Sequence, residues 1–234
     1  MLSVHKCYKA FMKEIYLGMK NLVYPIFCVI CSKPGSKICL SCNSPWMLPS
    51  KKAYIKDLPL YFVGDYGEEI STILLLAKEH GNKVAIEILS LALIESIKHL
   101  ICDKKISQPL NIVPIPSISR AIRRRGRDHI NFLCIDVVEK LRDYSIFAKV
   151  APILVLNRKI KDQSRLNQHQ RIQNLKNAYS LKGQIPTSGD FILLDDVATT
   201  GSSLVEGARA LSAAKIAIQG AVTACAGGRN SLIR

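Results

Sequence analysis

The chain has 234 residues and a formal net charge of +15, from 33 Lys and Arg against 18 Asp and Glu, and 48% of its residues are hydrophobic. This length and apolar content suffice for one good-sized α/β domain and a small additional module, and leave no room for a second large domain. The charge favours nucleic acid, anionic lipid or phosphorylated ligands as partners. A merely solvated basic surface is the alternative interpretation.

The first 27 residues lack the pattern of a secretory signal. Four lysines interrupt their apolar residues: Lys6, Lys9, Lys13 and Lys20. Residues 6–24 instead predict a basic amphipathic helix, because aromatic and aliphatic residues recur on one face. We favour packing of this helix onto its own domain over contact with a membrane surface. We therefore expect a cytoplasmic protein, with the inner face of the cytoplasmic membrane as the place of any peripheral contact.

Four cysteines form two close pairs. Cys28, Cys31, Cys39 and Cys42 follow the spacing C-x2-C-x7-C-x2-C. Each pair can form a tight knuckle, and two knuckles complete the tetrahedral shell of thiolates that suits Zn²⁺. Because a closed shell leaves no open position, this metal would fold the segment and not catalyse. Redox dithiols or buried thiols are the alternative, and a disulfide framework is not expected in the cytoplasm.

Strands and helices alternate along the rest of the chain. The residue pattern predicts strands at 61–66, 110–116, 151–156, 191–196 and 215–226, and helices at 68–79, 84–101, 129–144 and from Ser202. This order predicts a parallel sheet with helices on both faces. The polar residues 157–177 are interpreted as a mobile excursion over a site.

The most apolar run, 84–101, carries charged residues that are costly at a bilayer centre: Glu87, Glu95 and Lys98. We interpret it as a core helix and not as a membrane span. The chain then divides into a basic N-terminal segment (1–24), a zinc-ribbon-like module with a Pro-punctuated connector (25–60) and an α/β domain (61–234).

Two adjacent aspartates, Asp195 and Asp196, end the strand predicted at 191–196. Ligands of parallel sheets bind beyond the carboxyl ends of the strands, so both carboxylates would face a ligand. The turn ATTGSS (198–203) supplies backbone N–H groups, hydroxyls and a glycine, and it leads into a helix N-terminus that attracts phosphate. Carboxylates beside a phosphate cup fit a ligand with a phosphate and a vicinal diol, and they can hold Mg²⁺ directly or through water.

Two other interpretations of this strand remain. It could hold Mg²⁺ in a P-loop NTPase, but the sequence contains no G-x-x-x-x-G-K-[ST] motif and no G-x-G-x-x-G motif. It could also be a core strand followed by an ordinary solvated turn, since hydroxyls and glycine are common in turns. No histidine lies at metal spacing from another, so four are interpreted as surface or satisfied side chains: His80, His99, His129 and His169.

The stretch ILLDDVATTGSSL (192–204) resembles the 5-phosphoribosyl-1-pyrophosphate (PRPP) binding motif of type I phosphoribosyltransferases. Over about residues 25–226 the chain is similar to the ComF proteins of that superfamily, which combine a four-cysteine zinc module with a phosphoribosyltransferase-like domain. The stretch VPIPSISRAIRRRGRDHI resembles the ComF signature after the strand predicted at 110–116, with Arg127, Asp128 and His129 in place of Phe-Asn-Gln. The stretches DQSRLNQHQRIQNLKNAY and LAKEHGN resemble two further family motifs. The resemblance implies a type I phosphoribosyltransferase-like parallel sheet flanked by helices.

The resemblance also implies roles for individual residues. Asp195 and Asp196 would be the catalytic pair and would bind the ribose hydroxyls of PRPP, with Mg²⁺ nearby. The 5′-phosphate would lie in the turn formed by Ala198, Thr199, Thr200, Gly201, Ser202 and Ser203. The pyrophosphate would face the basic loop that contains Pro114, Arg120 and Arg125. Contacts to DNA phosphates would come from Arg123, Arg124, Arg127, Arg165 and Arg171, although the run RRRGR also fits a solvated basic face.

Two functions stay open. In the first, which we favour, the protein is a competence factor of natural transformation that binds incoming single-stranded DNA, and its PRPP site binds a ligand or regulates. Exposed aromatic rings would stack on the bases: Trp46, Tyr54, Tyr61 and Phe132. The resemblance implies single-stranded DNA, PRPP and a competence helicase or other DNA-uptake proteins as partners. In the second, the protein is an active phosphoribosyltransferase on an unidentified base or nucleotide.

Overall fold

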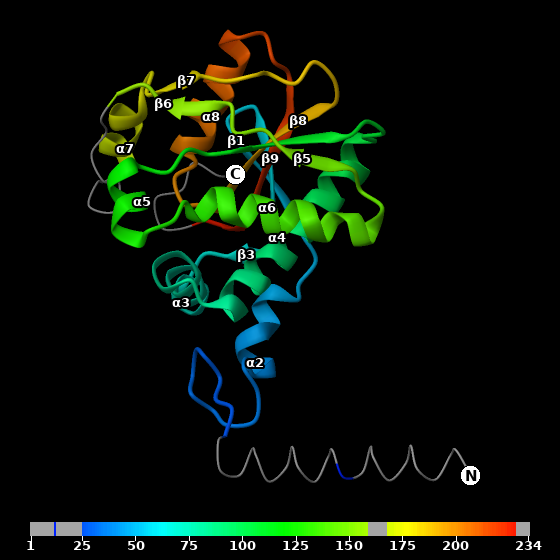
Figure 1. The fold of residues 1–234 in the computed structure, drawn as a ribbon, viewed down its shortest axis with the longest axis vertical. Helices are drawn as coiled ribbons and strands as arrows, with labels where there is room; N and C mark the ends of the chain where they lie inside the picture. Colours follow the sequence, from blue (N-terminus) through cyan, green and yellow to red (C-terminus); the bar gives the residue numbers. More distant parts are fainter. Residues whose placement is uncertain (1–11, 13–24, 159–167, 228–234) are drawn as a thin grey trace. The chain divides into compact units, whose positions relative to one another are not determined.

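The computed structural model describes residues 12, 25–158 and 168–227 (Figure 1). The chain divides into two compact units, Met1–Ser44 and Pro45–Arg234. Each unit is built around its own set of local contacts, and each is therefore described by itself.

The division falls earlier in the chain than the boundary predicted at residue 60. Two strands, β1 (Lys51–Ile55) and β2 (Leu58–Phe62), form an antiparallel hairpin, and β2 continues into the sheet of the second unit. The segment interpreted as a Pro-punctuated connector therefore contains strand β1 and the start of β2. The amphipathic helix predicted over 6–24 lies outside the described residues, apart from Met12.

The described part of the first unit is a turn followed by a short helix. The Cys28 N–H donates to the Lys33 carbonyl at 2.8 Å, and Phe27 and Pro34 form an isolated antiparallel bridge. Helix α2 (Leu40–Asn43) follows. This arrangement brings the first cysteine pair, on the turn, close to the second pair at the helix.

The second unit contains a sheet of seven strands among the described residues, in the order β1-β2-β9-β8-β4-β5, with β3 also paired to β9. Every strand pair in it is parallel except β1–β2. The other strands are β3 (Gly64–Asp65), β4 (Leu110–Pro114), β5 (Ala148–Val150), β8 (Asp190–Ala198) and β9 (Ile218–Ala226). The central strands are almost fully buried, as expected for a parallel sheet covered on both faces.

Helices cover both faces of this sheet (Figure 1). Helices α4 and α6 pack on one face and α8 on the other, and alternate residues of β8 point to opposite faces: Leu193 joins the core cluster of Leu204 and Leu211 on α8, whereas Leu194 does not. The helices are η1 (Ser44–Trp46), α3 (Glu68–Leu75), the π-helical turn η2 (Leu76–His80), α4 (Lys83–Lys104), α5 (Ser119–Arg125), α6 (His129–Leu141), η3 (Arg142–Tyr144), α7 (Gln168–Leu175) and α8 (Ser202–Ala213). The predicted α/β fold with a flanked, mostly parallel sheet is confirmed.

The apolar run predicted as a core helix forms α4. Asn82 caps its N-terminus by accepting hydrogen bonds from the N–H groups of Val84 and Ala85. Its buried residues pack against the sheet, while Glu87 and Glu95 are exposed. Within the described part of the chain, no helix combines the length and the apolar character that crossing a membrane requires.

The region between α6 and β8 differs from its prediction. Residues 151–156 were expected to form one strand of the main sheet. The edge strand of the main sheet is instead β5, which ends before these residues. Strand β6 (Leu154–Leu156) pairs antiparallel with β7 (Tyr179–Leu181) in a separate sheet. Pro152 between β5 and β6 has no N–H to donate to a ladder, which explains the interruption. Helix α7 occupies part of the polar stretch predicted as a loop, and the centre of that stretch lies outside the described residues.

The register of β4 and β8 brings their carboxyl ends together. Pro114 at the end of β4 is paired with Leu194, one residue before Asp195, and the Ile115 N–H donates to the Leu194 carbonyl at 2.9 Å. The loop after β4 and the acidic end of β8 therefore meet at one edge of the sheet.

Candidate functional site

A cavity of about 430 Å³ lies at this edge of the sheet. Its walls come from the end of α3, the turn η2, the loop after β4, helix α5 and the start of α8. Asp195 and Asp196 line it from β8, and Thr199 and Ser203 line it from the turn before α8. The two aspartates and two of the hydroxyls expected to bind a ligand thus face one common space.

Asp196 is a buried, ion-paired carboxylate. Its Oδ2 lies 3.1 Å from Lys78 Nζ and 3.5 Å from Nε2 of the buried His129. Burial opposes ionisation, but the Lys78 ammonium and the His129 ring outweigh it and hold the pKa of Asp196 below its ordinary range. In return, the Asp196 carboxylate raises the pKa of Lys78. The pair is therefore charged at neutral pH.

Asp195 has the opposite electrostatic character. Burial and the neighbouring charge of Asp196 raise the pKa of the Asp195 carboxyl well above its usual range. Its Oδ1 accepts a hydrogen bond from the Asp196 N–H at 2.9 Å. Adjacent carboxyls whose pKa values are moved apart are typical of functional sites, because one can donate or accept a proton where the other stays charged.

The turn after the aspartates divides its hydroxyls between the cavity and the interior. Thr200 and Ser202 are buried, and their hydroxyl oxygens lie 2.9 Å apart. Thr199 and Ser203 line the cavity. Gly201 caps α8 with φ +74°. This helix N-terminus therefore opens toward the cavity with backbone N–H groups and hydroxyls, an arrangement that suits a phosphate.

Gly201→Ala should lower the free energy of unfolding by about 2 to 3 kcal/mol, because the new Cβ adds left-handed strain and a clash. That Cβ would lie 2.7 Å from the Ile55 side chain. Urea unfolding measures the effect. The matched control is Gly126→Ala, where φ is +69° and nothing lies within 4 Å, so only the strain of about 1 kcal/mol remains. Equal losses in the two variants would contradict the role assigned to the close contact with Ile55.

An ion pair on α8 holds another wall of the cavity. Tyr179, at the start of β7, lines the cavity, and its N–H donates to Glu206 Oε1 at 3.2 Å. Arg209 Nη2 donates to the Tyr179 carbonyl at 3.1 Å and pairs with Glu206 at 2.8 Å. Because Glu206 is buried and satisfied by these partners, it fixes β7 on α8 and places the Tyr179 ring beside the turn.

The basic run after β4 contacts the η2 turn across the cavity. Arg124 Nη2 lies 3.0 Å from Glu79 Oε2, and Arg125 Nε lies 3.1 Å from Glu79 Oε1. Both arginines line the cavity. Arg127 points elsewhere: its Nη2 donates to the carbonyls of Ala77 and Lys78, at 2.8 and 3.1 Å. The run is therefore not simply a solvated face.

The other described residues predicted for the basic loop and for DNA do not line this cavity. Arg120 and Arg123 are exposed on α5. Pro114 is buried in β4 and lines a second cavity of about 400 Å³, which shares the loop after β4 with the first. Ala198 is buried, and its carbonyl accepts from the Gly227 N–H at 3.0 Å. Arg165 and the side chain of Arg171 lie outside the described residues.

Three residues that line the cavity, and one buried residue beside Asp196, received no role from the sequence. Lys78 was noted only as a match to a family motif, Glu79 and Tyr179 carried no ligand assignment, and His129 was interpreted as a surface or satisfied histidine. His129 is buried, and neither of its ring nitrogens has a hydrogen bond within the described part of the chain. For Lys78 the only signal in the sequence was indirect, because this lysine belongs to the stretch LAKEHGN that resembles a family motif and lies three residues before the Gly81 helix stop.

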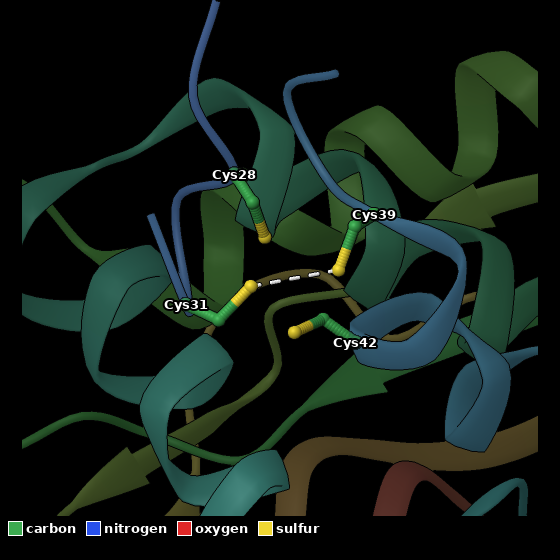
Figure 2. A group of neighbouring side chains, drawn as sticks. All are labelled: Cys28, Cys31, Cys39 and Cys42. Carbon is green, nitrogen blue, oxygen red and sulfur yellow. Dashed lines mark hydrogen bonds between the residues drawn. The ribbon is translucent and has the colours of Figure 1, made fainter. Parts of the chain in front are cut away.

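The four cysteines predicted to bind a metal converge. Their Sγ atoms all lie within 4.8 Å of one another, and those of Cys31 and Cys39 are 3.6 Å apart (Figure 2). Partial burial and the neighbouring thiols raise the pKa of Cys42 to about 12. Four thiolates cannot carry their charges this close together without a cation, so the cluster is compatible with a metal such as zinc.

The predicted base-stacking surface is partly wrong. Tyr61 is fully buried, and its hydroxyl donates to Asp103 Oδ2 at 2.6 Å. Trp46 is 7% exposed. Neither ring can stack on a base. Tyr54 and Phe132 are 45% and 49% exposed and stay available. Sequence alone did not distinguish core aromatics from surface aromatics.

A mostly parallel sheet, an acidic strand end and a hydroxyl-rich turn before a helix define an α/β domain with a candidate ligand site at the carboxyl ends of its strands, and a four-cysteine cluster precedes this domain in the chain. The comparisons with known proteins then point to one group of relatives. No family model matches the chain. Over 194 residues it is 27% identical to the DNA utilization protein YhgH of Escherichia coli O157:H7 and of strain K12, a match that covers 79% of this chain and 83% of the relative.

The YhgH protein of Salmonella typhimurium strain LT2 matches with the same identity and coverage. The chain is therefore similar to YhgH over most of its length. A crystal structure of orotate phosphoribosyltransferase from Aeropyrum pernix is 12% identical over 79% of this chain and 77% of that chain, with a TM-score of 0.33. That structural likeness is weak.

Proposed function

We propose that this protein handles single-stranded DNA during natural transformation and that its cavity binds PRPP or a related phosphoribosyl ligand. The observation that carries the first half is the match to DNA utilization proteins over most of the chain. The second half rests on the cavity at the end of β8 and on its carboxyl, hydroxyl and guanidinium groups. The proposed setting is the cytoplasm, with a helicase or another DNA-uptake protein as partner.

Basic charge supports the DNA-binding half of the proposal. The chain carries +15 formal charges, which attract a polyanion and release its counterions. Arg120 and Arg123 are exposed on α5, and the rings of Tyr54 and Phe132 are exposed elsewhere on the second unit. Guanidinium groups and exposed rings are the usual means of binding a single strand without strong sequence preference.

The cavity supports the phosphoribosyl half. Thr199, Ser203 and the N-terminus of α8 suit a 5-phosphate, and the adjacent carboxyls can accept hydrogen bonds from ribose hydroxyls. Arg124 and Arg125, on the opposite wall, suit a diphosphate. They would release their ion pairs with Glu79 and bind the diphosphate oxygens instead. The site thus has separate groups for the two anionic ends and the sugar of PRPP.

The aspartate pair does not fit a magnesium ion held by the protein alone. Mg²⁺ prefers ionised carboxylate oxygens. Asp196 is already paired with Lys78, and the pKa of Asp195 is raised. We therefore propose that Mg²⁺ enters with PRPP, coordinated by the oxygens of its diphosphate group.

An active phosphoribosyltransferase is the second candidate function, favoured by the two arginines on the cavity wall. Their guanidinium groups would stabilise the charge of the departing diphosphate, while charge of the opposite sign builds on the ribose ring next to the aspartates. An acceptor nucleophile would then attack the anomeric carbon. Consumption of PRPP with release of diphosphate would support this candidate over ligand binding alone.

For the cysteine cluster we propose a structural zinc ion bound by all four thiolates. A shell of four sulfurs leaves no position for substrate or water, so the metal would stabilise residues 25–44 and take no part in chemistry. The nearby Lys33 and Lys37 would offset the charge of the centre.

Replacing Arg120 and Arg123 together by Gln should weaken the binding of a single-stranded oligonucleotide and reduce the salt dependence of its affinity. Loss of two phosphate contacts should lower the slope of log affinity against log salt by about 1.4, since each contact to a single strand contributes about 0.7. Fluorescence anisotropy over a salt series measures this slope. The control is Lys149→Gln, an exposed cation on β5. If the double variant binds with the wild-type slope, α5 is not part of the DNA surface.

A further inference from the structure

Lys78 places an ammonium group in the cavity beside the buried carboxylate of Asp196. Its Nζ lies 3.1 Å from Asp196 Oδ2, on the carboxylate that is more deeply buried. The His129 ring approaches the same oxygen at 3.5 Å from α6. Lys78 itself lines the cavity and keeps a third of its side-chain surface exposed. The ammonium can therefore serve the carboxylate and a ligand oxygen at the same time.

The backbone around Lys78 is held in an unusual conformation. Lys78 is the third residue of the π-helical turn η2, and such turns are frequent at functional sites. Arg127 donates to the carbonyls of Ala77 and Lys78. Gly81 ends the turn with φ +64°, and a Cβ at this position would lie 2.5 Å from Arg127 Nη1. The position of Lys78 is thus set by a guanidinium on the loop between α5 and α6.

The charges that line the cavity favour binding of an anion that carries no metal ion. Among the described residues the lining contains three cationic side chains and three acidic ones: Lys78, Arg124, Arg125, Glu79, Asp195 and Asp196. Their formal charges cancel, so the lining carries no net negative charge that a metal ion would have to offset. A phosphate can therefore enter without bringing its own metal ion.

We propose that Lys78 is a built-in counter-cation, so that the cavity binds a ribose 5-phosphate group without a divalent metal ion. This inference rests on the proposed phosphoribosyl site and specifies its ionic requirement. Lys78 neutralises Asp196 and leaves the carboxylate oxygens able to accept the ribose hydroxyls. Magnesium then matters only for ligands that carry a diphosphate.

The test is calorimetric titration of the zinc-loaded full chain with ribose 5-phosphate, in divalent-free buffer and in buffer with excess Mg²⁺. The wild type should bind with less than about a twofold difference between the two buffers. Lys78→Met should bind at least about tenfold more weakly in divalent-free buffer and recover part of that loss with Mg²⁺. Lys78→Arg, which keeps the charge, should stay within about threefold of wild type, and the exposed Lys149→Met should not change binding.

Circular dichroism of each variant verifies that it is folded before it is titrated. Wild-type binding that appears only with Mg²⁺ would overturn the role of Lys78 and leave the phosphoribosyl site standing. Wild-type chain that binds ribose 5-phosphate in neither buffer would overturn the site itself and this inference with it. Equal binding by wild type and Lys78→Met in divalent-free buffer would also overturn the inference.

Discussion

Asp195→Asn is expected to stabilise the protein at neutral pH, whereas the neighbouring change Asp196→Asn is expected to destabilise it. Burial raises the pKa of Asp195, so the folded protein holds this proton more tightly than the unfolded chain does. Above the ordinary pKa of 3.8 the unfolded chain therefore gains relative stability as its carboxyl ionises. A neutral Asn avoids this cost, and the gain should be about 1 kcal/mol or more at neutral pH.

Asp196→Asn removes the partner of a mostly buried cation. Because the pKa of Asp196 is lowered in the folded state, its contribution to stability is present above the ordinary pKa of 3.8 and is lost as the pH falls below it. The loss should be about 2 kcal/mol at neutral pH, less than the 3 to 5 kcal/mol typical of a fully buried pair, because Lys78 is one third exposed. The destabilisation should shrink in acid.

Urea unfolding at neutral and acidic pH measures both effects, with the exposed Asp143→Asn as control. A change of the same sign in the two variants would contradict the opposite characters assigned to the pair.

Calorimetry with PRPP and Mg²⁺ adds the functional result: both variants should lose PRPP binding by about tenfold or more, since each removes a ligand-facing carboxyl. Binding of a single strand should survive in both. Loss of strand binding together with PRPP binding would mean that one site serves both ligands.

Cys39→Ser is expected to release the metal and to unfold residues 25–44 locally, while the second unit stays folded. The described part of the first unit has little core of its own, and a structural zinc supplies the free energy that folds such segments. Metal affinity should fall by about 100-fold or more. Zinc content after dialysis and hydrogen exchange of residues 25–44 report the two effects.

Cys102→Ser is the matched control, because Cys102 is an exposed cysteine on α4 outside the cluster. It should retain one zinc ion per chain and wild-type exchange. Stoichiometric zinc in Cys39→Ser, with unchanged affinity, would contradict a shell of four thiolates. Faster exchange throughout the sheet of the second unit would contradict the independence of the two units.

The elements that the sequence predicted well are those with a local signal. The apolar strand that ends in Asp195, the helix from Ser202 and the helix stop at Gly81 follow from patterns within a few residues. The cysteine cluster follows from spacing alone, since two short knuckles need only one turn between them. The order of strands and helices was sufficient for the fold class.

The elements that were missed depend on partners far apart in the chain. Lys78 reaches Asp196 only because η2 and β8 meet at one edge of the sheet, and no spacing rule relates them. The hydrogen bonds of Arg127 to the carbonyls of Ala77 and Lys78 could not be predicted, because carbonyl acceptors are the same for every residue type. Tyr61 looked like a stacking ring because tyrosine is enriched in strands, and its presence in one does not show whether its ring is buried.

The hairpin that opens the second unit joins the sheet through its last strand. Leu60 on β2 pairs with Ala221 on β9, and β9 then lies between β2 and β8. During synthesis, β2, the second strand to leave the ribosome, must therefore wait for β9, the last described strand, before the sheet can close. A nascent chain stalled before residue 218 would hold β2 and β8 as unpaired edges, at the stage when it is most exposed to aggregation and to proteases.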